Sequence, residues 1–426
     1  MLEVAAEPTR RRLLQILASG EHTVTELAAQ FPVTRSAVSQ HLGTLVEVGL
    51  VSARKQGRQR YYRLDEAGML RLQEMVRSFW SDELDHLVAE ATTATQGDLA
   101  MPFEKAVLVP LEPATTFALI TEPERLRRWM AVAARIELRA GGEYRWTVTP
   151  GHIAAGTVIE VDPGKRVVLS WGWEDGDPPP GCSTVSITLT PVDGGTEVRL
   201  IHDGLNDEQA NRHAEGWNHY LDRLVSAGRS GDAGPDEWAN EPQDIDELSS
   251  AEATLAVLQR VLRSLGDADL SKQTACTEFN VAQLGDHLMN SIMAIGKSAD
   301  APLKPRDMNA PLESQVADAA EVVLEAWRRR GVEGMVTLNS NQVPAILPIR
   351  VLSLEFLLHA WDFARAIDQQ VLVSDQVAEF VHGIAGKVIT PEARRYAGFA
   401  DPVATAPDAA TFDRLVAFAG RQPTTA

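Results

Sequence analysis

Residues 34–51, TRSAVSQHLGTLVEVGLV, restrict the fold of this chain more than any other stretch. They predict a helix, because Thr34 is a favoured N-cap residue and Gly49 suits the position just after a helix C-terminus. Apolar residues recur at helical spacing and would face a core: Val38, Leu42, Leu45 and Val46. The other side would carry side chains that can bond base edges and phosphates: Thr34, Arg35, Ser36, Ser39, Gln40 and His41. Helical periodicity alone fits an ordinary amphipathic helix equally well.

The neighbouring segments favour DNA binding. Residues 25–31 predict a short helix, and Pro32-Val33 a turn, so that with the next helix they form a helix-turn-helix layout. Residues 51–64 predict a two-stranded hairpin, a wing, with its tip at Gly57. Basic wing residues could neutralise phosphates along a DNA groove: Arg54, Lys55, Arg58 and Arg60.

These segments resemble the ArsR family of winged-helix repressors over about the first 90 residues. The similar motifs are Arg11-Arg12-Leu13-Leu14, Glu26-Leu27-Ala28, Ser36-x-x-Ser39-x-His41-Leu42-x-x-Leu45, Gly49-Leu50-Val51 and Gly57-Arg58-x-x-Tyr61-Tyr62. The resemblance implies a domain over residues 1–91 that dimerises and binds a double-stranded DNA operator. Metal-sensing members typically carry Cys-x-Cys before the recognition helix, where this chain has His22-Thr23-Val24-Thr25-Glu26. Thiolate metal sensing by this domain is therefore not implied.

The charge distribution is compatible with this prediction. The net charge over the 426 residues is −19, which does not suit a DNA-binding protein. Residues 1–63, however, contain nine Lys or Arg and five Asp or Glu, a local balance of +4, so the acidic residues lie downstream. A balance of that size also fits ordinary variation along a chain.

Length and composition limit the class of protein. A chain of 426 residues predicts two to four domains, and 44% apolar residues suffice for their cores. No apolar run approaches the roughly 18 residues of a membrane helix, and the N-terminus does not read as a secretion signal. Cys182 and Cys276 lie far apart, so a disulfide framework is not indicated and a cytoplasmic location is expected.

Residues 68–91 predict one long helix with an apolar stripe too wide for a lone surface helix. The stripe contains Leu72, Met75, Val76, Phe79, Trp80, Leu84, Leu87 and Val88. The ArsR resemblance suggests that it packs across a two-fold axis in a homodimer, which would place two recognition helices about one DNA turn apart. The alternative is that the stripe packs on the next domain.

After a polar linker at 92–100, residues 102–228 predict a strand, two short helices, a run of antiparallel strands and a last helix at about 207–226. This order resembles the START-like helix-grip superfamily, in the branch related to the chaperone ATPase activator. The similar motifs are residues 118–126 with Trp129, Gly141-Gly142-Glu143-Tyr144, Gly156-x-Val158 and Gly216-Trp217. The resemblance implies an apolar cavity for a small-molecule effector, with candidate lining residues Trp129, Trp146, Trp171, Trp173 and Trp217. For any single tryptophan a place in the core is the more common explanation, and no catalytic constellation is evident.

Residues 227–246 predict an exposed linker, followed by helices at about 251–265, 281–299, 312–330, 348–368 and 374–389 and a tail that is mostly coil. Glu355 and His359 are four residues apart and share one helix face. With His287 from a neighbouring helix they would form a two-histidine, one-carboxylate set of the kind that holds catalytic zinc. The spacing by itself also fits a surface Glu–His pair.

Residues 251–426 resemble the DinB-like, mycothiol-dependent maleylpyruvate isomerase superfamily of actinobacteria. The similar motifs are Cys276 with Val281-x-x-Leu284-x-x-His287, Glu355-x-x-x-His359-x-x-Asp362-x-x-Arg365-Ala366, and tail residues 395–421. The resemblance implies a four-helix bundle at 247–426 that binds Zn²⁺ through His287, Glu355 and His359, with a low-molecular-weight thiol as a possible partner. Phe279, Ala275 and Thr277 depart from the usual pattern, which puts the thiol in doubt more than the metal.

The sequence thus predicts a multidomain α+β protein with a winged helix-turn-helix, a helix-grip α+β domain and a DinB-like four-helix bundle. The favoured function is a dimeric, ligand-responsive DNA-binding regulator, more a regulator than an enzyme, with no membrane partner. One alternative is a bifunctional zinc- and thiol-dependent transferase or isomerase that also binds DNA. Another makes the two C-terminal domains scaffolds for protein contacts.

Overall fold

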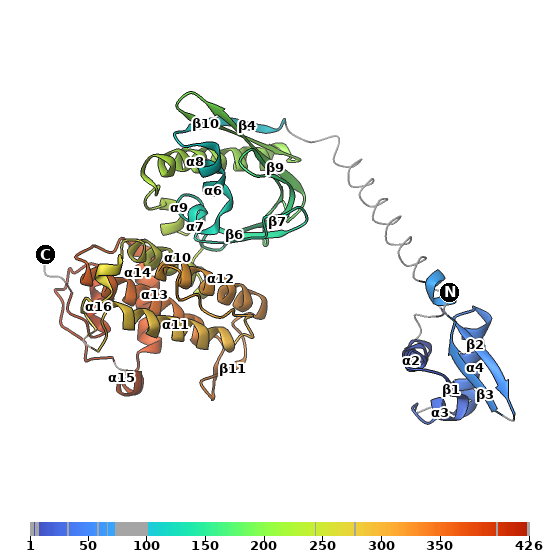
Figure 1. Ribbon diagram of the computed structural model, residues 1–426. Helices are drawn as coiled ribbons and strands as arrows, with labels where there is room; N and C mark the ends of the chain where they lie inside the picture. Colours follow the sequence, from blue (N-terminus) through green and yellow to red (C-terminus); the bar gives the residue numbers. More distant parts are fainter. Residues whose placement is uncertain are drawn as a thin grey trace. The chain divides into compact units, whose positions relative to one another are not determined.

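The computed structural model of this chain describes residues 4, 8–31, 34–57, 59–65, 67–72, 101–242, 244–276, 278–397 and 399–423 (Figure 1). The chain divides into two compact units, Met1–Asp98 and Leu99–Ala426. In the described part of the chain, no helix is both long enough and apolar enough to cross a membrane.

The first unit is a winged helix-turn-helix. Its elements are α2 (Pro8–Leu17), β1 (His22–Thr23), α3 (Val24–Ala28), α4 (Arg35–Glu47), β2 (Val51–Gln56) and β3 (Gln59–Leu64), with the strand order β1-β3-β2. Helix α3 begins at a capping box, in which Thr23 and Glu26 bond each other's backbone N–H groups. A core of leucines joins the helices to the wing: Leu13, Leu27, Leu42, Leu45 and Leu50 are completely buried.

Several predicted features of this unit lie outside the described residues. They are the turn Pro32-Val33, the wing residue Arg58, the linker 92–100 and most of the expected dimerisation helix, which is described only as far as Leu72. Met69 and Leu72 are half-buried against the core of this unit. The dimer and its stripe therefore stay predictions.

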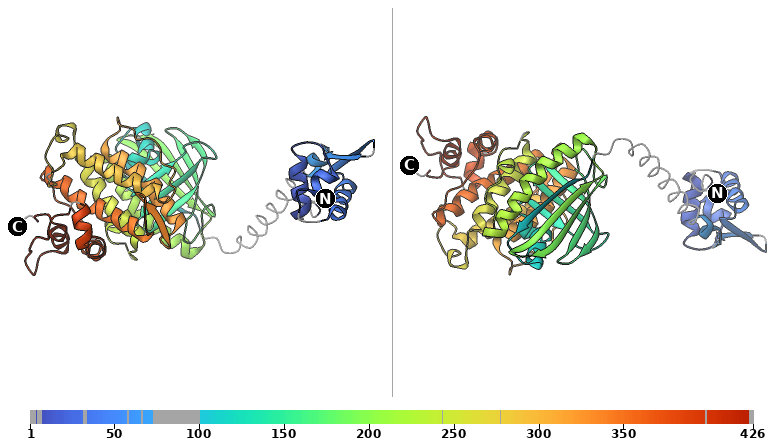
Figure 2. Two further views of the ribbon diagram at one scale, coloured as in Figure 1. Left: turned by 90° about the horizontal axis from the view of Figure 1, so that it is seen from below. Right: turned by 90° about the horizontal axis from the view of Figure 1, so that it is seen from above.

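The second unit begins with a seven-stranded antiparallel sheet in the order β4-β10-β9-β8-β7-β6-β5. Its elements are β4 (Phe103–Val109), α6 (Pro113–Thr121), α7 (Pro123–Leu126), β5 (Ala133–Ile136), β6 (Glu143–Thr149), β7 (His152–Asp162), β8 (Arg166–Trp171), β9 (Ser183–Val192), β10 (Gly195–Asp203) and α8 (Asp207–Ser230). The sheet curves around α8, and the core lies between them (Figures 1 and 2). This is the predicted helix-grip arrangement. Strands β9 and β10 join in a hairpin at Gly194 and Gly195, which both have positive φ.

The rest of the second unit is mainly helical. Its elements are α10 (Glu247–Leu262), a short 3-10 helix (Asp267–Asp269), α11 (Val281–Lys297), α12 (Leu312–Arg330), β11 (Met335–Leu338), β12 (Asn341–Pro344), α13 (Ile346–Ala366), α14 (Asp375–Val388), α15 (Pro391–Ala397) and α16 (Thr411–Phe418). Helices α10 and α11 each pack on both α12 and α13. Trp327, Phe356 and Phe363 are completely buried between them.

One expectation for this helical part was incomplete and another was wrong. The tail does not lack helices, because α15 and α16 form there, although most of its described residues are irregular; Leu415 and Val416 of α16 are completely buried. Residues 227–246 are not an exposed linker either, because α8 continues to Ser230 and α9 (Glu237–Asn240) follows. Trp238 of α9 stacks on His219 with ring centroids 4.1 Å apart, and Ala239 is buried. Arg223 of α8 also donates to the carbonyls of Gly234 and Pro235, so this connector, residues 231–246, is held on α8 by ring and polar contacts.

Buried polar contacts join the helix-grip part to the helical part. Arg127 and Glu313 form an ion pair in which the two side chains are only 1% and 4% exposed. Nearby, Gln259 donates from its side-chain amide to the carbonyl of Val132 at 3.0 Å. The backbone N–H of Gly151 donates to the Glu252 carboxylate at 2.7 Å. These bonds fix the two parts of the second unit against each other, because breaking them would leave buried polar groups without partners.

Candidate functional site

Helix α4 presents a polar, solvent-exposed face in the first unit. The Thr34 hydroxyl accepts a hydrogen bond from the N–H of Ala37 at 3.3 Å, which starts the helix at the predicted residue. Val38, Leu42 and Leu45 turn inward and are completely buried, whereas Val46, which was also expected to face the core, is exposed. The predicted DNA-contacting side chains lie on the opposite side: Thr34, Arg35, Ser36, Ser39 and Gln40 are exposed, and His41 is half-buried.

The wing carries a pair of like charges. Lys55 lies directly opposite Arg60 in the β2–β3 register, and both are exposed. Neither forms an ion pair with an acidic group among the residues that the structure describes. Like charges directly opposite in a sheet are destabilising, so this pair favours an anionic partner such as a phosphate.

Arg54 differs from the other predicted wing residues because it is already paired. Its guanidinium is bidentate to Glu21, with Nε–Oε1 at 2.7 Å and Nη2–Oε2 at 2.5 Å. It also lies over the ring of Tyr61, 5.2 Å from the centroid. Glu21 precedes β1, far from Arg54 in sequence, and sequence spacing carried no signal for this contact. Arg54 therefore links the wing to the residue that precedes β1.

A cavity of about 680 Å³ opens between the sheet and α8 in the second unit. Three of the five predicted tryptophans line it: Trp171, Trp173 and Trp217. Trp129 and Trp146 do not line it, which corrects the prediction. The indole N–H of Trp129 donates to the carbonyl of Leu119 at 2.9 Å, and Trp146 packs on Tyr144 in the core. Trp238 of α9, in the connector between α8 and α10, also lines the cavity, which the sequence did not suggest.

Two neutral histidines hold the cavity's tryptophans in place. The indole N–H of Trp217 donates to Nδ1 of His202 at 2.9 Å, and that of Trp173 donates to Nε2 of His213 at 3.1 Å. Indole nitrogens only donate, so each histidine must present an unprotonated nitrogen. Burial lowers the pKa of His202 to about 3, and the nearby His213 contributes to the decrease. Burial also lowers the pKa of His213.

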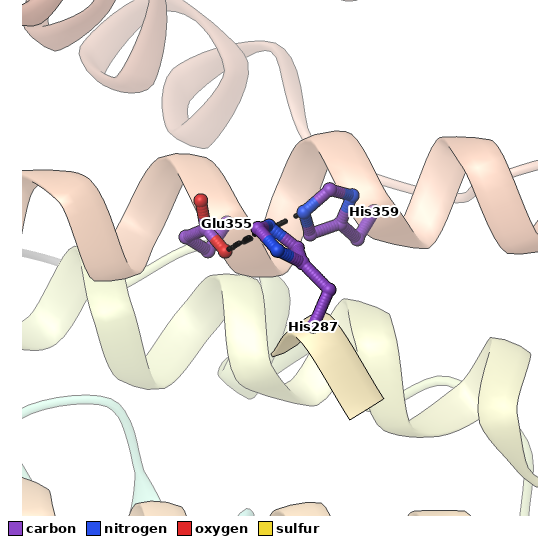
Figure 3. A group of neighbouring side chains, drawn as sticks. All are labelled: His287, Glu355 and His359. Carbon is purple, nitrogen blue, oxygen red and sulfur yellow. Dashed lines mark ion pairs between the residues drawn. The ribbon is translucent and has the colours of Figure 1, made fainter. Parts of the chain in front are cut away.

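The structure brings together the three predicted metal ligands, His287 from α11 and Glu355 and His359 from α13 (Figure 3). One ligand atom from each lies within 4.8 Å of the other two. Oε2 of Glu355 is 3.5 Å from Nε2 of His287 and 3.4 Å from Nε2 of His359. The two imidazole rings are perpendicular, with centroids 5.3 Å apart. Three donors thus converge on one point from two helices.

Neighbouring side chains orient this group. Nδ1 of His359 lies 3.0 Å from a carboxylate oxygen of Asp362, which leaves Nε2 for the cluster. Arg421, after α16, donates to both oxygens of Asp362 at 2.9 and 2.7 Å. Phe279 stacks on His287 with ring centroids 5.3 Å apart. The tail therefore contributes to the site through Arg421.

The charges of the cluster fit a cation. Burial alone would raise the pKa of Glu355, but the two histidines outweigh it and hold that pKa well below its usual range. Burial alone would lower the pKa of His359, but the carboxylates of Asp362 and Glu355 outweigh this effect, and the pKa is raised. Oε2 of Glu355 is buried and accepts no hydrogen bond of good geometry among the described residues. A buried carboxylate oxygen facing two imidazole nitrogens is the donor set that Zn²⁺ prefers.

Comparisons with known proteins agree with the fold of the first two domains. Residues 7–53 match the family model of bacterial regulatory proteins of the arsR family, and residues 110–228 match that of activator of Hsp90 ATPase homolog 1-like proteins. An HTH-type transcriptional regulator of Mycobacterium tuberculosis is 42% identical over 82 residues, which are 19% of this chain and 77% of that protein. A biofilm growth-associated repressor of Agrobacterium fabrum is 40% identical over 74 residues, 17% of this chain and 63% of that protein. An AHSA1-like protein of Rhizobium etli, solved by NMR, is 38% identical, with 34% of this chain and 89% of that one covered and a TM-score of 0.28.

The exposed face of α4, the basic wing and these matches define a DNA-binding regulator of the helix-turn-helix class. The chain belongs to the arsR family of bacterial regulatory proteins, and it carries an AHSA1-like domain after its DNA-binding domain.

Proposed function

We propose that this protein is a homodimeric, effector-responsive repressor that binds a double-stranded DNA operator through α4 and the wing. The observation that carries the proposal is the polar face of α4, where Arg35, Ser39 and Gln40 are exposed, together with the like charges of Lys55 and Arg60 on the wing. Side chains at the start of a recognition helix contact base edges, and wing cations contact phosphates. The relatives named as a transcriptional regulator and a repressor support the same assignment.

The experiment is a fluorescence-anisotropy titration with DNA selected from a random pool by the full-length protein. Arg35→Ala and Gln40→Ala should each reduce discrimination between selected and random DNA by about 1–3 kcal/mol. Lys55→Ala should instead weaken binding to all sequences equally and flatten its salt dependence. Glu47→Ala, exposed at the far end of α4, is the control and should change neither quantity. Unchanged discrimination in both the Arg35 and Gln40 variants would refute the proposed interface.

The homodimer is part of the same proposal. An operator with two half-sites about one helical turn apart requires two recognition helices related by a two-fold axis. Light scattering of the full-length protein at micromolar concentration tests this point. A monomeric mass would remove the dimer from the proposal and leave the DNA-binding face of α4 intact.

We infer that the second unit receives the signals: an apolar small molecule in the helix-grip cavity, and Zn²⁺ at His287, Glu355 and His359 in a DinB-like helical domain. Two imidazoles, one carboxylate and the unsatisfied Glu355 oxygen support the metal. Three protein ligands leave a position open for water or a thiol. A zinc ion there supplies a Lewis acid, which suits sensing or catalysis better than a purely structural role.

The open position also supports a second candidate function, a zinc- and thiol-dependent transferase or isomerase. The two roles respond differently to chelation of the metal. For a sensor, removal of zinc must change operator affinity, because a ligand shifts an equilibrium only if it binds the two states unequally. For an enzyme, removal should abolish turnover and leave operator affinity unchanged. Anisotropy titrations of the zinc-loaded and chelated protein decide between them.

A further inference from the structure

We propose that the helix-grip cavity takes an organic cation, an apolar molecule that carries a positive charge. The inference rests on the proposed role of this cavity as the effector site, and it adds the charge of the effector. The cavity has a volume of about 680 Å³, within the usual range for sites that hold small molecules.

The cavity wall consists largely of aromatic rings. They belong to Trp171, Trp173, Trp217, Tyr220 and Trp238. The rings of Trp171 and Trp217 have centroids 5.0 Å apart, and those of Trp171 and Trp173 are perpendicular at 5.8 Å. Aromatic faces carry negative charge density and attract ammonium and guanidinium groups, most strongly where water is excluded. A wall of this kind therefore binds apolar matter in general and cations in particular.

The polar groups of the lining are predominantly acidic. Four carboxylates line the cavity, those of Asp175, Asp177, Glu215 and Glu241, against the single guanidinium of Arg212. With histidines counted as neutral, the lining carries a net charge of −3. Carboxylates this close to a bound charge lie within the Debye length of about 10 Å at 0.1 M salt, so they act on it.

Pairing within the protein leaves two of these carboxylates available. Arg212 binds Asp177, with Nη2–Oδ2 at 2.9 Å, and Arg328 lies 3.7 Å from a carboxylate oxygen of Asp175. Glu215 and Glu241 are exposed at the cavity and form no ion pair among the described residues. A cation in the cavity would find both carboxylates without displacing any partner.

An anion would find no unpaired cation in the same lining among the described residues. The indole N–H groups of Trp173 and Trp217 are already donated to His213 and His202. The one guanidinium is engaged by Asp177. The indole N–H of Trp171 and the hydroxyl of Tyr220 form no hydrogen bond among the described residues, but both donors are neutral. Charge therefore decides between the two ions, because the four carboxylates repel an anion and attract a cation. The lining thus discriminates by charge as well as by apolar contact.

The test uses two ions of the same shape and opposite charge, tetraphenylphosphonium and tetraphenylborate, with Nile red as an uncharged probe. Binding to the full-length protein is followed by quenching of tryptophan fluorescence. Tetraphenylphosphonium should bind at least about tenfold more tightly than tetraphenylborate at low salt, and salt should reduce the ratio. Equal affinities, or tighter binding of the borate, would overturn the inference and leave the cavity as an effector site.

Charge-neutralising variants locate the effect. Glu215→Gln and Glu241→Gln, combined, should reduce the cation-to-anion ratio several-fold and leave Nile red binding unchanged. Glu208→Gln is the matched control, because Glu208 is exposed on the same helix α8 but does not line the cavity. A ratio that the double variant leaves unchanged places the cation elsewhere and overturns the inference. If none of the three probes binds, the effector role of the cavity fails together with it.

Discussion

Replacing Glu313 with Gln should strongly destabilise the second unit. Glu313 lies in the first turn of α12, and its side chain is only 4% exposed. Its Oε1 and Oε2 are each 3.3 Å from a guanidinium nitrogen of Arg127, and Oε1 is 3.4 Å from Nε of Arg263. Burial alone would raise the pKa of Glu313, but the two arginines outweigh it and lower that pKa, so the group is ionised at neutral pH.

The size of the effect follows from what remains after the substitution. Among the described residues, Arg127 would keep one ion-pair partner, Asp318, whose side chain is 69% exposed. Arg263 would keep its ion pair with Asp232 and its hydrogen bond to the carbonyl of Arg127. Removing one partner of a buried ion pair costs about 3–5 kcal/mol, because a buried charge is left uncompensated. The control is Glu124→Gln, which breaks the exposed pair with Arg128 and should cost at most about 0.5 kcal/mol.

The assay is urea unfolding of the full-length protein, followed by tryptophan fluorescence. Because Arg127 belongs to the helix-grip part and Glu313 to the helical part, we expect both parts to unfold in one transition. The midpoint of this transition should move to a lower urea concentration, and the dependence of the unfolding free energy on urea concentration should not change. The contribution of Glu313 is present above its unfolded-state pKa and is lost as the pH falls through its lower folded-state pKa, so the variant should differ least from wild type in acid. A loss below about 1 kcal/mol at pH 7 would refute the reasoning, since that is the size expected of a surface pair.

Three further outcomes are expected. Asp362→Asn should lower zinc affinity about 10–100-fold in a chelator competition, because Asp362 orients His359, and unchanged affinity would argue against the metal site. Burial lowers the pKa of His202 to about 3, so between pH 6.5, about its ordinary pKa, and pH 3 only the unfolded state binds a proton there. The free energy of unfolding should therefore fall by about 1.4 kcal/mol for each pH unit of acidification in this range. His202→Gln should remove this pH dependence. Thr34→Ala should cost the first unit about 1 kcal/mol in thermal unfolding, whereas loss of a cap that does not form would cost nothing.

The sequence predicted the elements whose signals are local. Thr34 as an N-cap and the buried face of α4 follow from residue types within one or two helical turns, and the structure confirms them. Helical spacing also placed Glu355 and His359 on one face, whereas the full set with His287 was implied by the DinB-like resemblance. Local patterns suffice where the geometry of one element decides the outcome.

Contacts between distant segments could not be predicted in this way. Arg54 is neutralised by Glu21, and Asp362 by Arg421, across 33 and 59 residues of chain. Among the tryptophans, residue type predicted burial but not which rings would face the cavity. Trp129 bonds to the backbone of a neighbouring helix, whereas Trp238 of the polar connector packs on α8. Each of these outcomes depends on how elements pack, which no local spacing encodes.

The same packing connects the cavity with the proposed metal ligands. Glu252 of α10 is only 2% exposed and accepts a hydrogen bond from the N–H of Gly151, which lines the cavity. Glu252 also forms an ion pair with Arg328, whose guanidinium lies 3.7 Å from Asp175, another lining residue. Helix α10 packs along α13, where the hydroxyls of Ser250 and Ser353 are 2.8 Å apart, and α13 carries Glu355 and His359. A ligand that shifts Gly151 would have to break its hydrogen bond to the buried Glu252 carboxylate or move α10 with it. Because the interior is closely packed, a movement of α10 would also displace its neighbours. Binding free energies are reciprocal, so whatever factor an effector imposes on zinc affinity, zinc must impose on the affinity for the effector.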